Sequence, residues 1–468
     1  MSQNNNIIKV EGREINPAKV DGPSDVFSSA SFQLAKSRWQ EDNDANICVL
    51  CNQKFNQIRR KHHCRQCGRV LCSKCCYAKM PLPQLGYGDA ERVCDFCKPV
   101  CELVTKARSP MLSYELEGAK GLSEFVRDPD GVKRVVETGG LQTLIWLARQ
   151  GDEQMRGYII SALHCLAMHT SLHPVLAESG TIKAVCSILS NADAEQILID
   201  GISSLMIFCK SSDLKTQAIK DGALHPVLTL CNHSQDAIAL VALKTLSLIV
   251  EHAGTHTAII ESERSALPKV LALTASSDEQ VQEVSLKLLA HLSMGTDYHR
   301  QRIVQEDFTT GKGILKVLRS NPNNIQVLCN AACLVGNLAT SEHSQGALQE
   351  VIDPLCLMLG SHTESVELTT HVIRAIANFA KYPQNAWRLI PYLAHFTRSC
   401  LKSANNALKF QATRCILHLL LHSTNETTEG LMKEGAAELL KGLVEIPELM
   451  ESMHKSILKN VSERCRPM

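Results

Sequence analysis

Cysteines form the most chemically specific pattern in this chain of 468 residues. Eight of them stand in four pairs near the N-terminus, and each pair has two residues between its members. This spacing lets both thiolates of a pair reach one tetrahedral metal ion, as in structural zinc sites. A single such pair also occurs in redox sites, but four in succession favour two zinc ions. The pairs are Cys48/Cys51, Cys64/Cys67, Cys72/Cys75 and Cys94/Cys97.

The spacing alone does not decide which pairs share a zinc ion, so sequential and interleaved arrangements are both open. A segment this short buries too little apolar surface to fold by itself. Metal binding should therefore supply about 10–16 kcal/mol of folding free energy for each structural site. We expect this part of the chain to unfold when zinc is removed.

The same segment carries a dense positive charge, although the formal net charge of the whole chain is only +1. From residue 45 to residue 88 there is no Asp or Glu. A local positive field in a balanced protein indicates an anionic ligand, such as a phospholipid headgroup, a nucleic acid or a phosphorylated partner. The basic residues of this stretch are Lys54, Arg59, Arg60, Lys61, Arg65, Arg69, Lys74 and Lys79.

Three short motifs accompany the cysteines, in the order Trp39-x-x-Asp42, Arg60-Lys61-His62-His63-Cys64-Arg65 and Arg92-Val93-Cys94. With the cysteine pairs they resemble the FYVE zinc finger over about residues 36–100. The resemblance implies an interleaved cross-brace of two structural zinc ions. One zinc ion would be held by Cys48, Cys51, Cys72 and Cys75, and the other by Cys64, Cys67, Cys94 and Cys97.

The resemblance also implies a ligand, phosphatidylinositol 3-phosphate in endosomal membranes. Guanidinium groups bind phosphate oxygens in pairs, and a carboxylate accepts hydrogen bonds from hydroxyl groups, so the motif residues suit a phosphorylated inositol. The implied headgroup-binding residues are Asp42, Arg60, Lys61, His62, His63, Arg65 and Arg92. The implied membrane-inserting loop is Gln57-Ile58, in which only Ile58 is apolar. Family members often carry two apolar residues there, so we expect membrane binding to depend on headgroup contacts and avidity.

The rest of the chain shows helical apolar spacing that repeats at steps of 41 to 46 residues. Such a period is typical of a helical solenoid of the armadillo or HEAT class. The equivalent positions are Leu166, Phe208, Ile249, Leu292, Leu338, Phe379, Leu420 and Val461. Glycines precede apolar stretches at Gly140, Gly180, Gly222 and Gly435, so the pattern resembles armadillo repeats more than HEAT repeats. We expect a mainly α fold, a right-handed armadillo-type solenoid of about eight repeats, behind a small two-zinc cross-brace finger.

These patterns predict four regions along the chain. They are a disordered segment over 1–30, the finger over 31–100, a linker over 101–112 and the solenoid over 113–468. A solenoid buries each repeat only against its neighbours and presents a concave surface, so we expect it to bind an unidentified protein partner. Asn337, Asn378 and Asn460 occupy equivalent positions on three repeats, and Leu419 takes that position on the repeat between the last two. They could contact a bound peptide or bond a neighbouring helix, and the sequence leaves both roles open.

No motif indicates catalysis. Gly311-Lys312 lacks the upstream glycine and the following Ser or Thr of a phosphate-binding loop. The eight cysteines saturate two zinc ions and leave no position for an activated water. We therefore expect a non-enzymatic adaptor that is cytoplasmic and peripherally associated with early endosome membranes. Free thiols and the polar stretch from Ser2 to Lys9, which does not resemble a signal peptide, favour this location.

Two other functions fit parts of the pattern. A RING-like ubiquitin-ligase adaptor would use a cross-brace finger to recruit a conjugating enzyme, but such a surface does not require the three motifs. A basic finger can also bind nucleic acid with a steep dependence on salt. Asp42 and His63 are better suited to hydroxyl groups, so no nucleic acid is expected.

Overall fold

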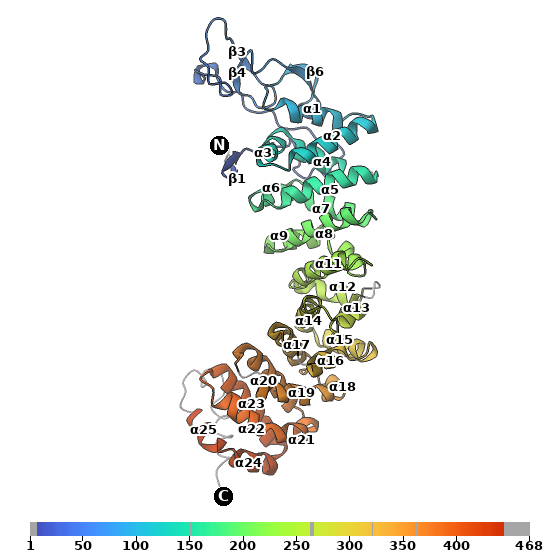
Figure 1. Cartoon of the computed structure of the whole chain (residues 1–468), viewed down its shortest axis with the longest axis vertical. Coiled ribbons are helices and arrows are strands. Elements are labelled where there is room, and N and C mark those ends of the chain that lie inside the picture. Colours follow the sequence, from blue (N-terminus) through green and yellow to red (C-terminus); the bar gives the residue numbers. More distant parts are fainter. Residues whose placement is uncertain (1–6, 150–151, 263–265, 321, 362–363, 444–468) are drawn as a thin grey trace. The chain divides into compact units, whose positions relative to one another are not determined.

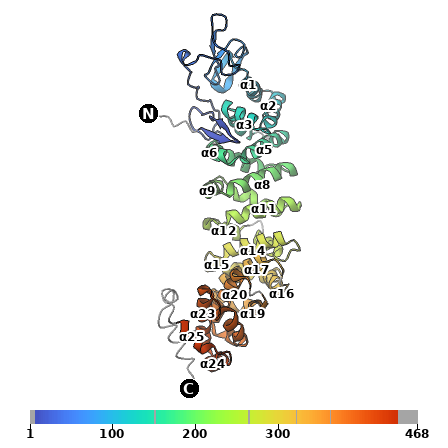
Figure 2. The same ribbon diagram turned by 60° about the vertical axis from the view of Figure 1, so that its left-hand side comes forward.

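The computed structural model describes residues 7–149, 152–262, 266–320, 322–361 and 364–443. The chain divides into two compact units, Met1–Ile249 and Val250–Met468, which are taken one at a time below as unit 1 and unit 2. Figures 1 and 2 show the ribbon from two directions. Both units contain stacked helices, and unit 1 also contains the cysteine-rich finger.

Unit 1 begins with short strands and continues with helices. The strands are β1 (Ile8–Val10), β2 (Arg13–Ile15), β3 (Lys61–His63), β4 (Val70–Cys72), β5 (Lys79–Leu82) and β6 (Tyr87–Arg92). The helices are α1 (Lys98–Ala107), α2 (Leu112–Phe125), α3 (Pro129–Thr138), α4 (Gly140–Leu147), α5 (Glu153–Ala167), α6 (His173–Glu178), α7 (Thr181–Ser190), α8 (Glu195–Cys209), α9 (Ser212–Lys220), α10 (Leu224–Leu230) and α11 (Asp236–Ile249).

The strands pair as three antiparallel hairpins, β1 with β2, β3 with β4 and β5 with β6. In the second hairpin Lys61 lies opposite Cys72, and His63 lies opposite Val70. All residues of β4 are buried, whereas those of β3 are half-buried, because β4 supplies the core of the finger and β3 its polar surface. In the third hairpin Lys79 lies opposite Arg92.

The helices of unit 1 repeat as triplets, in which two shorter helices precede a longer third helix. The third helices α5, α8 and α11 pack side by side. The predicted repeat positions Leu166, Phe208 and Ile249 are fully buried on them. Gly139 and Gly180, with φ of 89° and 88°, join a first helix to a second one. This left-handed conformation strains residues that carry a Cβ, which explains the glycines at these turns.

Unit 2 contains only helices among the residues described. They are α12 (His256–Ile260), α13 (Ala266–Leu273), α14 (Glu279–Ser293), α15 (Asp297–Thr309), α16 (Gly313–Ser320), α17 (Ile325–Leu338), α18 (Gln345–Leu348), α19 (Ile352–Ser361), α20 (Val366–Ala380), α21 (Ala386–Leu389), α22 (Leu393–His395), α23 (Asn406–His422), α24 (Thr424–Lys433) and α25 (Ala436–Leu443). A π-helical segment, Phe396–Leu401, directly follows α22.

The third helices of unit 2 are α14, α17, α20 and α23, and each packs against the next. The predicted repeat positions Leu292, Leu338, Phe379 and Leu420 are fully buried. The last predicted position, Val461, lies outside the described residues. The helical period read from the sequence is therefore confirmed on α14, α17 and α20, whereas the predicted register on α23 is wrong by one position, as the contacts of Arg414 show below.

A polar side chain closes the end of several third helices. In each case a residue at the start of the following helix, or directly before it, donates a hydrogen bond to a backbone carbonyl six positions earlier, where the preceding helix leaves its last carbonyls without partners. The pairs are His173 with Ala167, His256 with Val250, Gln345 with Ala339, and Asn385 with Phe379. These caps fix the turn into the next repeat.

Residues 7–34, called the N-terminal segment below, contradict the predicted disorder over 1–30. Val26 is fully buried, and its amide donates to the carbonyl of Ser179 at 3.1 Å. The Ala18 amide donates to Val136 at 3.0 Å. The polar composition suggested disorder, but the segment is ordered because apolar residues spaced along it fit between the first repeats.

The predicted linker over 101–112 is also largely absent, because α1 covers its first part and α2 begins at Leu112. Val100, Cys101 and Val104 of α1 are fully buried. The chain thus passes from the finger into the helical repeats through a packed helix. In the described part of the chain no single helix has the length and apolar character to cross a membrane, and only two bent helix pairs meet those criteria together.

Candidate functional site

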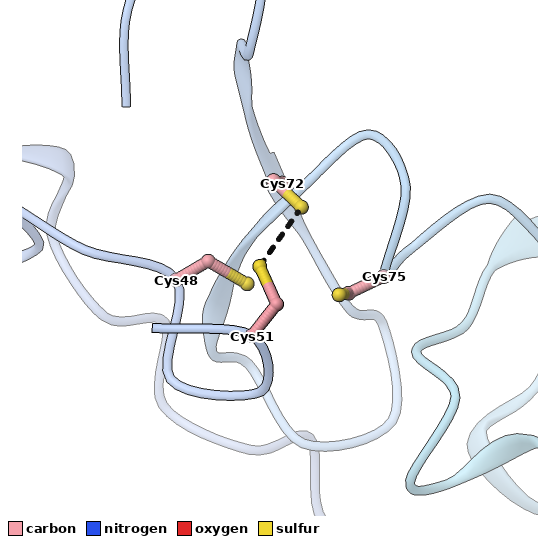
Figure 3. A group of neighbouring side chains, drawn as sticks. All are labelled: Cys48, Cys51, Cys72 and Cys75. Atoms are coloured by element: carbon pink, nitrogen blue, oxygen red, sulfur yellow. Dashed lines mark hydrogen bonds between the residues drawn. The ribbon is translucent and has the colours of Figure 1, made fainter. Parts of the chain in front are cut away.

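The eight paired cysteines lie in two compact groups. Within each group the four sulfur atoms all lie within 4.8 Å of one another. Figure 3 shows the first group, in which the sulfurs of Cys51 and Cys72 are 3.7 Å apart. The groups are Cys48, Cys51, Cys72 and Cys75, and Cys64, Cys67, Cys94 and Cys97. Four thiolates at this separation fit the tetrahedral shell of a structural zinc ion, so the finger fits two such ions.

The arrangement is interleaved, as the resemblance implied, because the β3–β4 hairpin contributes to both groups. Cys72 ends β4 and joins the first group, whereas Cys64 directly follows β3 and joins the second. The Cys94 amide donates to the sulfur of Cys64 at 3.3 Å, which ties the last pair to the hairpin. The two cysteine groups therefore hold the basic strand β3 at a fixed place in the finger.

The predicted headgroup residues gather around β3. Lys61, His62 and His63 form the strand, and Arg60 directly precedes it. The amide of Arg65 donates to the carbonyl of Arg92 at 2.9 Å, which brings these distant cations together. Burial lowers the pKa of His62, and the positive charges of Arg92 and Arg60 lower it further. The strand and its neighbours thus form a concentrated positive surface.

Trp39 supports this surface from the side. Its ring stacks on the imidazole of His63 with centroids 4.3 Å apart, and the guanidinium of Arg65 lies 4.6 Å from its centroid. Cation–π contacts of this kind orient a guanidinium without neutralising it. Arg65 also forms an ion pair with Glu91 at 2.9 Å.

Asp42 lies at the same surface. The ammonium of Lys61 donates to its backbone carbonyl, and the Nε2 atom of His63 lies 3.8 Å from its carboxylate. That Nε2 atom donates to the carbonyl of Gln40 at 2.7 Å. Asp42 is exposed, so its carboxylate oxygens are open to solvent next to the basic strand.

The predicted membrane-inserting loop lies just before the basic strand. The side chain of Asn56 accepts hydrogen bonds from the amides of Ile58 at 3.0 Å and Arg59 at 2.7 Å. This turn leaves the Ile58 side chain 92% exposed, next to exposed Gln57. A large apolar side chain held in solvent by a polar turn is suited to an apolar environment outside the protein.

Three residues that support this surface were missed in the sequence. Asn56 holds the loop, Glu91 pairs with Arg65, and Gln40 bonds both His63 and the amide of Val70. Glu91 directly precedes Arg92 in a strand, and Gln40 lies inside the Trp39-x-x-Asp42 motif. The motifs therefore pointed to Glu91 and Gln40, but their hydrogen-bond and ion-pair partners come from other segments and are brought close only by folding of the finger.

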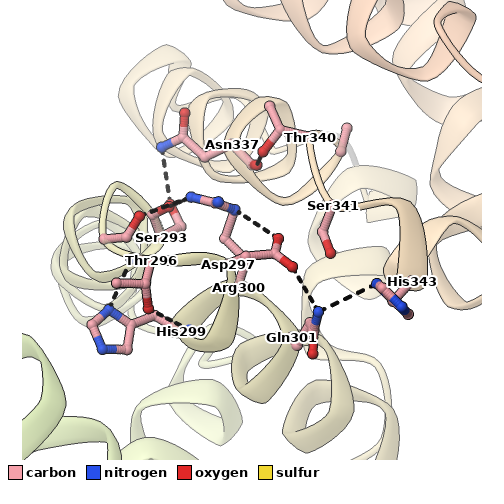
Figure 4. Close-up of polar contacts among 12 residues, drawn as sticks. Ser293, Thr296, Asp297, His299, Arg300, Gln301, Asn337, Thr340, Ser341 and His343 are labelled. Atoms are coloured by element: carbon pink, nitrogen blue, oxygen red, sulfur yellow. Dashed lines mark hydrogen bonds and ion pairs between the residues drawn. The ribbon is translucent and has the colours of Figure 1, made fainter.

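The asparagines of unit 2 take part in bonds between repeats. The side-chain amide of Asn337 donates to Ala290 at 3.2 Å and to the hydroxyl of Ser293 at 2.9 Å, beside Arg300 (Figure 4). That of Asn378 donates to Gly336 at 2.6 Å. Their carbonyl oxygens accept from the guanidinium groups of the next helix. These bonds run from Arg374 to Asn337 and from Arg414 to Asn378.

These contacts favour a structural role for Asn337 and Asn378, and Asn460 lies outside the described residues. They also fix the register of α23. Arg374 and Arg414, which are forty positions apart, each donate to an asparagine of the preceding third helix. Residues of α20 and α23 therefore correspond at a step of forty, and His418 is the equivalent of Asn378. The prediction that Leu419 takes this position is therefore wrong, and Leu419 is fully buried.

Comparison with known proteins identifies the first module. Residues 38–102 match the FYVE zinc finger family. Lateral signaling target protein 2 homolog of Brugia malayi is 48% identical over 60 residues, which are 13% of this chain and 10% of that protein. The 1-phosphatidylinositol 3-phosphate 5-kinase of Mus musculus is 38% identical over 65 residues, 14% of this chain and 3% of that protein. The chain therefore spans a small fraction of these relatives, and the match to the kinase covers only the finger.

The helical part matches solved repeat structures. UNC-45 from Drosophila melanogaster superposes with a TM-score of 0.62 at 17% identity, covering 79% of this chain and 51% of that one. At this identity the likeness concerns the fold alone. The predicted fold class, armadillo-like helical repeats behind a two-zinc finger, is confirmed.

Proposed function

We propose that this chain is a non-enzymatic adaptor that binds phosphatidylinositol 3-phosphate on early endosomal membranes and recruits a protein partner through its helical repeats. One observation carries the lipid part. The finger gathers the cations of two separate motifs on one surface with Trp39 and Asp42 of the third motif, around a half-buried strand and beside an exposed apolar loop. The chain's match to the finger of a kinase named for phosphatidylinositol 3-phosphate supports this choice of ligand.

The basic residues of the finger bind the phosphate groups of the lipid in this proposal. Arg60, Lys61, Arg65 and Arg92 bind the phosphate groups, because guanidinium and ammonium donors form strong hydrogen bonds with phosphate oxygens. His62 lies between them and adds a further donor. The ion pair with Glu91 and the stacking on Trp39 hold the Arg65 side chain in place before the lipid arrives.

Asp42 provides selectivity. Its exposed carboxylate accepts hydrogen bonds from inositol hydroxyls and repels a second phosphate at the neighbouring ring positions. His63, held by Gln40 and Trp39, supports the same hydroxyls. The finger therefore prefers the lipid with a single phosphate at position 3.

Gln57 and Ile58 enter the outer part of the bilayer. Full burial of one isoleucine side chain supplies about 1.5–3 kcal/mol, which is too little to hold a protein on a membrane alone. The headgroup contacts must supply the rest, or several copies must bind together. An Ile58→Asp variant should lose sedimentation with liposomes, whereas Leu112→Asp, at an exposed position on α2, should retain it.

The lipid test is co-sedimentation of the zinc-loaded chain with liposomes that contain the 3-phosphate, the 4-phosphate, the 5-phosphate or the 3,5-bisphosphate. Wild type should bind the 3-phosphate selectively, and Arg65→Ala should lose this binding. Arg69→Ala is the matched control, because Arg69 is an exposed arginine of the same finger outside the proposed headgroup site. Equal binding to all anionic lipids, or equal loss in both variants, would reduce the finger to an unspecific basic surface.

The recruitment part rests on the repeats. Each triplet exposes one side of its third helix, and successive third helices align these sides into a continuous surface within each unit. Such surfaces bind extended segments of other proteins. A carrier of this kind would bring its partner to the membrane that the finger recognises.

A further inference from the structure

The third helices of unit 2 expose one common surface, which we call the cationic face. It consists of side chains at three- and four-residue spacing on four helices, or within two residues of their ends, and the helices pack in the order α14, α17, α20 and α23. All of these side chains are partly or fully exposed except buried Asn378. Its residues are Val284, Lys287, His291 and Met294; Asn330, Cys333, Asn337 and Thr340; His371, Arg374, Asn378 and Lys381; and Gln411, Arg414, His418 and Leu421.

The charges of this face have one sign. None of its positions carries Asp or Glu, although the formal net charge of the whole chain is only +1. Four carry Lys or Arg and three carry His, namely Lys287, Arg374, Lys381, Arg414, His291, His371 and His418. Among the residues described, none of the four permanent cations forms an ion pair with a carboxylate. Glu283 and Glu367 lie only at its border, one turn earlier on α14 and α20.

The two arginines are fixed in position by neutral partners. Arg374 donates to Asn337 at 2.9 Å and to the carbonyl of Cys333 at 3.0 Å. Arg414 donates to Asn378 at 2.7 Å and to the carbonyl of Arg374 at 3.3 Å. Each guanidinium has five N–H donors, so donors remain for a ligand. Because these partners are neutral amide and carbonyl oxygens, the positive charges of Arg374 and Arg414 remain uncompensated.

The pKa directions agree with an uncompensated field. Burial lowers the pKa of Arg414, Cys415 raises it, and the neighbouring charge of Arg374 lowers it again. Burial lowers the pKa of His418, and Arg414 lowers it further. Bringing a carboxylate close to these groups would relieve the repulsion between them.

The spacing of the face fits an extended chain. Packed helices lie about 8–10 Å apart. A polyproline II segment has three residues per turn and rises about 3.1 Å per residue, so side chains three positions apart point the same way about 9 Å apart. One carboxylate at every third residue could thus meet the cations of successive helices.

The corresponding positions of unit 1 differ. On α5, α8 and α11 two lysines are balanced by one aspartate and one glutamate. The positions are Tyr158, Ser161, Cys165 and Met168; Asp200, Ser203, Ile207 and Lys210; and Val241, Lys244, Leu248 and Glu251. The positive field is therefore a property of unit 2 and not of every repeat.

We propose that the cationic face binds an extended acidic segment of the protein partner, with carboxylates at about every third residue. This proposal rests on the adaptor function and defines the chemical class of its partner. A peptide fits better than a nucleic acid, because the arginines are half-buried between helices, where a narrow chain reaches them.

The test measures fluorescence anisotropy of labelled peptides with the full zinc-loaded chain, without lipid. One peptide carries Glu at every third residue with Pro and Ser between, a second has the same composition with the Glu residues clustered, and a third replaces Glu by Lys. The spaced acidic peptide should bind most tightly, and the lysine peptide should not bind.

The decisive variant is Lys287→Gln with Lys381→Gln, which removes one half-buried and one exposed charge and leaves the Arg–Asn bonds intact. Loss of two such pairs should weaken binding roughly tenfold. The matched control is Lys269→Gln with Lys316→Gln, which removes two exposed charges from the second helices α13 and α16. Equal weakening in both double variants would overturn the proposal, as would preference for the clustered peptide.

Single-stranded DNA of the same charge is the remaining probe. The proposal would be overturned if wild type bound this DNA as tightly as the spaced acidic peptide, or more tightly, and if the Lys287→Gln/Lys381→Gln variant lost the DNA binding. Liposome sedimentation of the same variant should be unchanged. Failure of peptide binding is therefore distinguishable from failure of lipid binding.

Discussion

At the scale of single residues, the lipid surface depends on side chains that hold others in place. Trp39 orients His63 and Arg65, and Gln40 fixes the Nε2 atom of His63. None of these contacts neutralises the surface. The cations are therefore ordered before a phosphate arrives, which lowers the entropy lost on binding.

Among the glycines of the finger, Gly68 is the one that leaves the least space for a Cβ atom. Its φ is 71°, and a Cβ would lie 2.4 Å from the backbone carbonyl oxygen of Arg38. Gly68→Ala should cost about 1–3 kcal/mol in backbone strain alone and push the Trp39 segment away from β3. Faster release of zinc to a chromogenic chelator would report this loss.

The control for that substitution is Gly88→Ala in β6. Gly88 has no heavy atom within 4 Å of the position of a Cβ, and it has no positive φ. Release of zinc at the same rate from both variants would show that the turn at Gly68 tolerates a side chain.

The sequence predicted these residues unevenly. The eight cysteines and the motif cations could be found because each type has a fixed chemical use at a fixed spacing. Glu91 and Asn56 could not, because their value comes from partners that the fold brings near. The equivalent of Asn378 on α23 was misplaced by one position, since Leu419 and Leu420 are both fully buried and sequence spacing does not separate them.

At the scale of elements, the helices were easier to predict than the N-terminal segment. Leu166 and its equivalents recur with the period of the repeat, whereas the segment has no period and is rich in polar residues. Its order comes from single contacts. The Leu34 amide donates to Gln84 at 2.7 Å in the finger, and Asp25 pairs with Lys183 on α7.

Substitution at Val26 should release this segment. A carboxylate in the fully buried position of Val26 would remain uncompensated, so Val26→Asp should favour a detached segment. The amides of Ala18 and Val26, which donate to Val136 and Ser179, should then exchange with deuterium much faster. Ser24→Asp is the control, because Ser24 is exposed two positions earlier. Unchanged exchange in Val26→Asp would show that the segment is held elsewhere.

At the scale of the whole molecule, metal and helices contribute separately to stability. The finger has short hairpins and depends on its metal groups, whereas each repeat buries apolar side chains against its neighbours. Removal of zinc with a chelator should abolish lipid binding and leave most of the helical circular dichroism. Cooperative loss of both signals would show that the repeats need the finger to fold.

Zinc content should separate ligands from the adjacent thiol. Cys75→Ala should bind one zinc ion per chain instead of two, because Cys75 belongs to the first group. Cys76→Ala should keep both, since Cys76 is buried next to a ligand but belongs to neither group. Metal analysis of the purified variants measures this directly, and loss of zinc from Cys76→Ala would assign that thiol a metal role.

The N-terminal segment also determines how the protein can be divided for study. A fragment that starts at the edge of the finger motif, near residue 36, would omit Phe32 and Leu34. It would leave uncovered the side chain of Arg108, which donates to the Phe32 carbonyl and lies 4.5 Å from the Phe32 ring centroid. A truncated finger of this kind would expose apolar surface that the intact protein covers, and its self-association could be mistaken for a native property. A fragment that retains residues 7–34, the finger and α1 to α7 would keep the described partners of this segment on one polypeptide.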